Sequence, residues 1–349
     1  MRRRKKHHTE TPMQQAIDKT PDQPHLSLIK DIKVDPIFIL GDHSSGADLL
    51  YKALTKTNRF NAVNAYHIIS YSQLLSNHIQ QREPRAIQTL AKQLKPLEKS
   101  PKAYAYKLDS TPATPESPEE YGFILKNIAG DHPKITLDNL SIFQQLCQKA
   151  QYISSSPKPL LLNNPWDYSQ FQQVQQLIPK ARFIFIHRYP IHIINDQLKA
   201  ARLILSSKNK YMALLSRDYR EIFQHPIKRS LLRFLYSNYF NSGVRQVSDA
   251  AIIAANNFIE NIETLSKPTY CSIKYETFCQ SPAETIQHIL SFLEIEPESE
   301  INNKPYSHKK IELLPEVKKQ RDSICQRLRP YLTYHANLST NLAARSPTS

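Results

Sequence analysis

Short runs of branched apolar residues, separated by helical segments, constrain the fold of this chain most. Each run ends at a glycine, asparagine, proline or polar turn signal, and the runs cover residues 36–40, 158–164, 181–188 and 269–275. Between the second and third runs, apolar residues recur at helical spacing across 169–179. A strand, a helix and a strand of these lengths form a parallel pair joined by a crossover helix. The sequence therefore predicts an α/β fold whose central parallel sheet is flanked by helices.

The domain organisation follows from composition along the chain. Residues 34–335 are long enough and apolar enough for one α/β domain with loop insertions, since 40% of the 349 residues are hydrophobic. Residues 1–33 are basic, rich in histidine and punctuated by proline, which predicts a flexible basic arm. Residues 336–349 are expected to form a disordered tail. The stretch 80–120 predicts a helix followed by a long insertion loop.

The net charge of +15 favours anionic partners such as nucleotides, sulfated substrates, nucleic acid or an acidic membrane surface. No recognised nucleic-acid-binding module is visible, so we expect no nucleic acid partner. The four cysteines show no CxxC spacing, which is typical of a reducing compartment, and we expect a cytoplasmic protein. No run reaches the roughly 20 apolar residues of a membrane span, and the basic start lacks the apolar segment of a signal peptide.

The first apolar run is followed by GDHSSGADLL, residues 41–50, which contains two of the five glycines, Gly41 and Gly46. Small residues that open a helix expose backbone N–H groups and the positive end of the helix, and both features bind phosphate. The loop is not a Walker motif, because Ala47 and Asp48 stand where Lys and Ser or Thr are required. Two interpretations remain open, an anion-binding loop and a plain strand-to-helix turn.

Two further motifs follow strands. Arg188 in FIHRYP ends an apolar run just before Pro190, so its guanidinium is expected either to hold a phosphate or to form a surface ion pair. The segment YETFCQSPAETIQHILSFLEI, residues 275–295, reads on its own as a strand end packed against a helix. Ligands of such sheets bind at the carboxyl ends of the strands. We therefore expect the loops after the strands to meet at one rim.

In this order and spacing, the three motifs resemble the sulfotransferase family, in particular the branch that opens with GxxRSGTTLL. The resemblance covers residues 36 to 295. It implies a P-loop-like sulfotransferase architecture and transfer of a sulfuryl group from 3′-phosphoadenosine 5′-phosphosulfate (PAPS) to a hydroxyl or amine. The expected acceptor is a carbohydrate or small molecule, and its identity is beyond the sequence.

The resemblance also assigns residues to the donor. It implies that the loop cradles the 5′-phosphosulfate and that the position of Arg188, with the position eight residues later, grips the 3′-phosphate. The positions so assigned are Gly41, Ser44, Ser45, Gly46, Ala47, Asp48, Arg188 and Asp196.

The chain departs from the family at several of these positions. Ser44 replaces the loop arginine, Asp196 replaces a serine, and Ala47 and Asp48 replace two threonines; Asn163 stands where a lysine is expected. Two functional interpretations therefore stay open. One is an active sulfotransferase, and the other is a degenerate, non-catalytic member that binds a nucleotide, a sulfated glycan or a protein.

Two histidines are candidates for catalysis. His43 lies beside the missing arginine and would supply positive charge when protonated. His67, in AYHIISY, is the candidate general base, because an imidazole titrates near neutral pH; the alternative is a neutral histidine bonded to the backbone. The histidines lack paired metal-ligand spacing, so we expect no metal.

Overall fold

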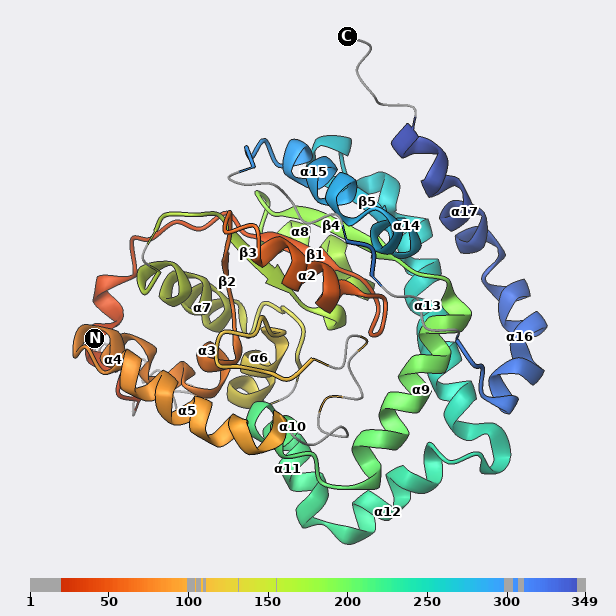
Figure 1. The fold of residues 1–349 in the computed structure, drawn as a ribbon, viewed down its shortest axis with the longest axis horizontal. Coiled ribbons are helices and arrows are strands. Elements are labelled where there is room, and N and C mark those ends of the chain that lie inside the picture. Colours follow the sequence, from red (N-terminus) through yellow and green to blue (C-terminus); the bar gives the residue numbers. More distant parts are fainter. Residues whose placement is uncertain are drawn as a thin grey trace, which may run out of the picture.

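The computed structural model describes residues 20–98, 104, 108, 111–130, 132–154, 156–297, 304–306 and 311–343. Its centre is a five-stranded sheet in the order β2-β3-β1-β4-β5 (Figure 1). The strands are β1 (Ile37–Leu40), β2 (Asn61–Ala62), β3 (Leu160–Asn163), β4 (Arg182–His187) and β5 (Tyr270–Lys274). All four strand pairings are parallel. The predicted α/β fold with a central parallel sheet is confirmed, and β2 is an additional edge strand.

Helices surround this sheet. Those before β3 are α2 (Ala47–Thr55), α3 (Ala65–Ile69), α4 (Leu74–Ile79), α5 (Glu83–Glu98), α6 (Gly122–Ala129) and α7 (Leu140–Tyr152). Those between β3 and β5 are α8 (Phe171–Leu177), α9 (Pro190–Ser206), α10 (Lys210–Leu215), α11 (Arg217–Gln224), α12 (Pro226–Leu235) and α13 (Ser242–Asn261). Those after β5 are α14 (Tyr275–Gln280), α15 (Pro282–Phe292), α16 (Pro315–Arg327) and α17 (Arg329–Ala343).

Both faces of the sheet are covered by apolar side chains, because successive residues of a strand point to opposite faces. Ile37 and Ile39 of β1 pack with α2, α14 and α15, whereas Phe38 and Leu40 pack with α7, α9 and α13. Figure 1 shows α2, α14 and α15 gathered on one side of the sheet. Each of these four side chains is buried. The continuous apolar runs seen in the sequence are therefore the two-faced core of a parallel sheet.

The register of the sheet brings three strand ends together. Ile39 of β1 pairs with Asn163 of β3, and Leu40 pairs with Phe185 of β4. Because the strands are parallel, the segments that follow β1, β3 and β4 all leave the same edge of the sheet. This edge is the rim at which the sequence predicted a ligand site.

The N-terminal segment differs from its prediction as a flexible arm. Residues 1–19 lie outside the described residues, but residues 20–33 pack against the domain. Asp22 is fully buried; its carboxylate accepts a hydrogen bond from Ser76 N–H and forms a 2.8 Å ion pair with Lys149 of α7. Ile29 is also buried. These buried contacts hold the segment in place, so the folded domain begins before residue 34.

The C-terminal part of the chain also differs from the predicted boundary. The last helix, α17, continues to Ala343 rather than ending near residue 335, and residues 344–349 lie outside the described part. Tyr331 and His335 on this helix are buried. No helix among the described residues is long and apolar enough to span a membrane.

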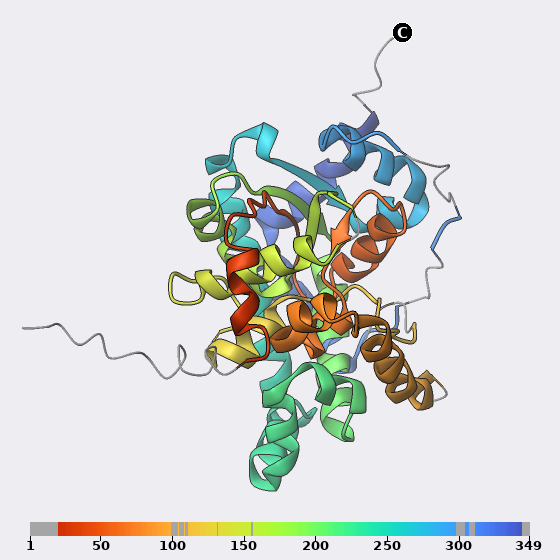
Figure 2. The same cartoon turned by 90° about the vertical axis from the view of Figure 1, so that its left-hand side faces the viewer.

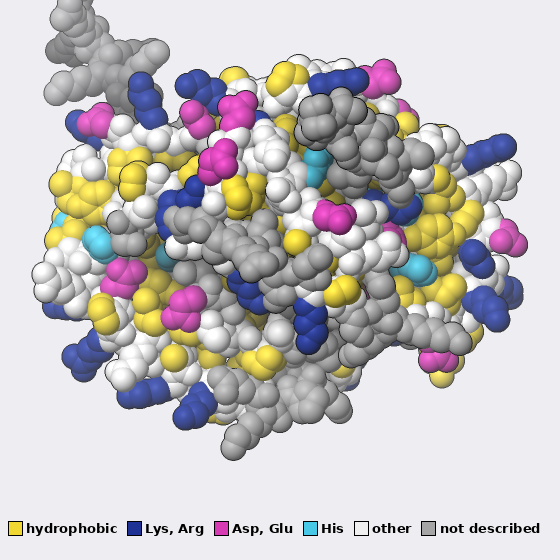
Figure 3. Space-filling view, turned by 45° about the horizontal axis from the view of Figure 1, so that its top comes forward, with side chains coloured by type: hydrophobic (Ala, Val, Ile, Leu, Met, Phe, Trp, Pro, Cys, Tyr) yellow, Lys and Arg dark blue, Asp and Glu magenta, His cyan; other side chains and the backbone are white. Residues whose placement is uncertain are grey.

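The charged side chains of the surface are mixed in sign. On the face shown in Figure 3, Lys and Arg side chains are dispersed, with Asp and Glu side chains between them.

Candidate active site

The loop between β1 and α2 is sharply bent. Ser44 and Gly46 have positive φ angles of 64° and 96°, and the N–H of Ser45 donates to the carbonyl of Asp42 at 2.9 Å. A Cβ atom at Gly46 would lie 2.2 Å from Cδ2 of Tyr275. Glycine is therefore required where the loop passes the tyrosine ring. The bend leads directly into α2, whose first N–H groups have no acceptor within the helix and favour an anion.

Arg188 holds this loop against α9. It follows the last residue of β4 and is only 3% exposed. One guanidinium nitrogen, Nη1, donates to the carbonyl of Ser44 at 2.7 Å, and Nη2 donates to Oδ2 of Asp196 at 2.8 Å. The guanidinium also lies over the ring of Tyr275, 5.0 Å from its centre. In the structure Arg188 forms an ion pair, and a buried one that shapes the loop rather than a surface pair. Its role at a phosphate stays a prediction.

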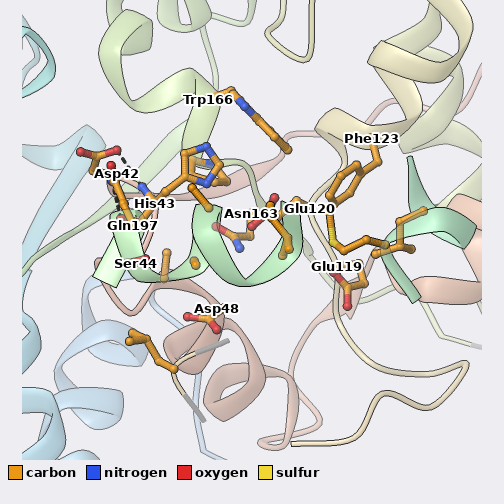
Figure 4. Close-up of a pocket in the computed structure, with 18 of the residues that line it drawn as sticks. Asp42, His43, Ser44, Asp48, Glu119, Glu120, Phe123, Asn163, Trp166 and Gln197 are labelled. Atoms are coloured by element: carbon orange, nitrogen blue, oxygen red, sulfur yellow. Dashed lines mark hydrogen bonds between the residues drawn. The ribbon is translucent and has the colours of Figure 1, made fainter. Parts of the chain in front are cut away.

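A cavity of about 510 Å³ opens beside the loop (Figure 4). Its wall combines four carboxylates with aromatic and apolar side chains, and no lysine or arginine is among the described residues that line it. The polar and aromatic residues of the wall include Asp42, His43, Ser44, Asp48, Glu119, Glu120, Phe123, Asn163, Trp166, Gln197 and Tyr236. Figure 4 labels all of these except Tyr236 and shows them around one space. They come from the loop and the start of α2, from the end of β3 and the turn after it, from α6 and the residues before it, and from α9. The cavity is therefore acidic, in contrast to the basic chain as a whole.

Burial sets the protonation of the cavity residues. Desolvation raises the pKa of Asp42 to about 6, against the effect of hydrogen bonds from the His43 N–H and from Gln197. The ring of His43 lies nearly perpendicular to that of Trp166, with 4.9 Å between the ring centres. Desolvation lowers the pKa of His43 to about 4. His43 is consequently neutral at pH 7. The expectation that it supplies the missing positive charge is corrected by this burial.

Two buried polar atoms at the site have no hydrogen-bond partner among the described residues. They are Oγ of Ser45, in the loop, and Oδ1 of Asn163, in the cavity wall. Gly41 leaves room for the Ser45 hydroxyl, because a Cβ atom at residue 41 would lie 2.4 Å from its Oγ. Buried polar atoms are rarely left unpaired. Both atoms are therefore candidates for contact with a ligand.

His67 does not line the cavity. Its N–H donates to Oδ1 of Asn64 at 2.9 Å, and its Nδ1 accepts from the Asn64 N–H at 3.3 Å, which forms a capping box at the start of α3. Desolvation lowers its pKa to about 4. We therefore reassign His67 from candidate general base to helix cap, which was the alternative that the sequence left open.

Replacing His67 with glutamine should flatten the acid sensitivity of the protein. The unfolded chain protonates this histidine below its ordinary pKa of about 6.5, whereas the folded chain keeps it neutral down to about 4, so stability falls as the pH drops through this window. His67→Gln keeps a capping side chain and should recover about 2 kcal/mol of the stability lost between pH 7.5 and pH 5. Urea unfolding at both pH values measures this. The control is His132→Gln, at an exposed position, and equal pH slopes in wild type and His67→Gln would refute the assignment.

The structure brings together only part of the predicted set. His43, Ser44, Ala47 and Asp48 line the cavity, whereas Arg188 and Asp196 pair with each other behind it. Reasoning from the sequence missed several wall residues, namely Asp42, Glu119, Glu120, Trp166 and Gln197. Asp42 lies inside the quoted loop and was detectable there. The others lie far away in sequence and carry no local signal.

Known proteins resemble this chain in sequence profile and in structure. The sequence profile of the sulfotransferase family matches residues 36–234. The crystal structure of sulfotransferase STF9 from Mycobacterium avium is similar with a TM-score of 0.54 and 14% identity, over 90% of this chain and 71% of that chain. For sulfotransferase STF1 from Mycobacterium tuberculosis H37Rv the TM-score is 0.47 at 12% identity, over 90% and 81% of the two chains. No protein with a curated description matches the chain. At these identities, the similarity to STF9 concerns the fold alone.

Proposed function

Because this chain belongs to the sulfotransferase family, we propose that it transfers a sulfuryl group from PAPS to an acceptor held in the acidic cavity. The observation that carries the proposal is the position of the loop. Residues 41–46 bend into the N-terminus of α2 at the edge of the cavity. A donor on the loop and an acceptor in the cavity would then meet at Ser44 and Ala47, which line the wall.

The backbone of the loop fits the 5′ end of the donor, whereas the Asp48 carboxylate in the first turn of α2 opposes a second negative charge there. The first turn of α2 offers N–H groups and the positive end of a helix, and the unpaired Oγ of Ser45 adds a further polar contact. The bound donor supplies the activated sulfuryl group. The backbone of the loop would bind and orient the donor. Gly41 and Gly46 allow this backbone to pass close to Ile186 and Tyr275.

The residues assigned to the 3′-phosphate fit less well. Arg188 already pairs with Asp196, whose other oxygen accepts from Asn195 Nδ2 at 3.1 Å. A phosphate must share or displace this carboxylate, so the donor should bind less tightly than it would with a serine at position 196. This ion pair favours the second candidate function, a non-catalytic member that binds a nucleotide, a sulfated glycan or a protein.

The cavity favours an amine over a hydroxyl as acceptor. Amines are cationic at neutral pH and are attracted by carboxylates and by aromatic faces such as that of Trp166. A protonated amine must lose a proton before it attacks. Asp42 suits this step, because its pKa of about 6 leaves it ionised at pH 7 yet able to accept a proton. We assign it as the general base.

Transfer of labelled sulfate from PAPS to panels of amines and alcohols tests this function. We expect amine products, with a rate that rises as the pH increases through about 6, where Asp42 loses its proton. Asp42→Asn should lower the rate by about 10²- to 10⁴-fold. The control is Asp138→Asn, at an exposed position, which should leave the rate unchanged. Ligand binding without turnover of any acceptor would favour the non-catalytic alternative.

We also propose that the protein works in the cytoplasm. Its four cysteines, Cys147, Cys271, Cys279 and Cys325, are all free. Free thiols persist in a reducing compartment.

A further inference from the structure

Helix α12 presents an unusual apolar face to solvent. Ile227, Leu231 and Phe234 are 86%, 66% and 55% exposed, although all three are large apolar residues. Their spacing of four and three residues places them on one side of the helix. Tyr239, which follows in the next turn, is 67% exposed. Half of the eight exposed large apolar side chains among the described residues therefore lie within 227–239.

The segment of chain that carries this face is rich in basic residues. Residues 208–236 contain seven Lys and Arg residues but only two Asp and Glu residues. Lys228 is exposed on the same helix as the apolar face. Arg233 fixes the helix by donating to the carbonyls of Leu205 and Ser206 at the end of α9. Helix α12 is thus a basic amphipathic helix that hydrogen bonds anchor to the end of α9.

The helix lies at the edge of the molecule. Figures 1 and 2 both show α10–α12 at the lower end, away from the sheet. A flat partner can therefore approach α12 without meeting the sheet or the helices that cover it.

We propose that α12 docks the protein onto an anionic phospholipid surface. The side chains of Ile227, Leu231 and Phe234 enter the boundary between headgroups and acyl chains, and Lys228 and its basic neighbours lie against the lipid phosphates. Charge selects this partner over a second copy of the chain, because two such faces brought together would repel each other. The attachment is peripheral, since α12 has only ten residues and lies along the surface.

Vesicle co-sedimentation of the full-length protein tests the proposal. The protein should bind vesicles of phosphatidylcholine that contain phosphatidylserine, and bind phosphatidylcholine alone much more weakly. The triple variant Ile227→Ser/Leu231→Ser/Phe234→Ser should lower the partition coefficient about tenfold or more. Lys228→Glu should weaken binding to the anionic vesicles only, and added salt should weaken it further.

A matched control tests whether vesicle binding depends on α12 in particular or on exposed apolar side chains in general. Leu137→Ser/Ile253→Ser removes two apolar side chains that are 75% and 65% exposed elsewhere, and it should leave vesicle binding unchanged. Circular dichroism should show the same helix content for every variant. The proposal is overturned if the triple variant binds as tightly as the wild type or if the wild type does not bind anionic vesicles. It is also overturned if size-exclusion chromatography shows that the wild type is a dimer and the triple variant a monomer, since α12 would then dock a second copy of the chain.

Discussion

Gly46→Ala is expected to abolish donor binding and to lower the free energy of unfolding by about 3 kcal/mol. Two penalties combine at this position. The residue has a φ of 96°, which alanine adopts only with strain, and the added Cβ would lie 2.2 Å from the ring of Tyr275. Relief of that overlap must move the loop or the tyrosine, over which the Arg188 guanidinium lies. Calorimetry with 3′-phosphoadenosine 5′-phosphate and urea unfolding measure the two effects.

Gly130→Ala is the matched control for this substitution. Gly130 has a similar φ of 87°, but a Cβ atom there meets nothing within 4 Å. The control should therefore show only the conformational penalty, about 1 kcal/mol, and normal donor binding. Equal effects of the two substitutions would mean that the contact with Tyr275 does not position the loop.

Asp196→Ser is expected to tighten the binding of 3′-phosphoadenosine 5′-phosphate about ten- to a hundredfold. In the wild type, Nη2 of Arg188 donates a hydrogen bond to the Asp196 carboxylate at 2.8 Å. A serine would remove the competing negative charge and leave this donor group available to a phosphate. The measurement is calorimetric titration of both proteins.

Adenosine 5′-phosphate gives the internal control for the Asp196 prediction. It lacks the 3′-phosphate, so its affinity should change little. If both nucleotides gained affinity equally, the tighter binding would come from the change in net charge of the protein and not from a 3′-phosphate contact with Arg188. If neither gained affinity, the pairing of Arg188 with Asp196 would not be what limits donor binding.

The sheet and its rim were predictable because their determinants are local. Strands β1, β3 and β4 are continuous apolar runs closed by turn signals, and a parallel sheet forces their carboxyl ends to one edge. The edge strand β2 escaped notice because two half-buried residues, Asn61 and Ala62, carry no periodicity.

The fixed N-terminal segment depends on partners distant in sequence. Asp22 and Lys149 form their buried ion pair across more than a hundred residues of chain. No local pattern reports such a contact, and the polar composition around Asp22 favoured the prediction of a flexible arm.

The chemistry of the site was predicted less well than its position. The sequence showed that Asp196 replaces the expected serine, and the structure shows what its carboxylate does: it forms an ion pair with Arg188. For His67 the structure shows the second of the two interpretations that the sequence left open, a histidine bonded to the backbone; Asn64, three residues earlier, is a typical helix-capping residue. The wall of the cavity joins residues that are far apart in sequence, and only the fold brings them together.

The most direct test of donor binding on this loop is calorimetric titration of 3′-phosphoadenosine 5′-phosphate into the wild type and into Arg188→Ala. We predict micromolar binding by the wild type and none by the variant. Arg182→Ala is the control, because Arg182 lies at the other end of β4, where it bonds the carbonyls of Phe292 and Leu293, and it should bind normally. No heat from the wild type at millimolar ligand would contradict the proposed donor site.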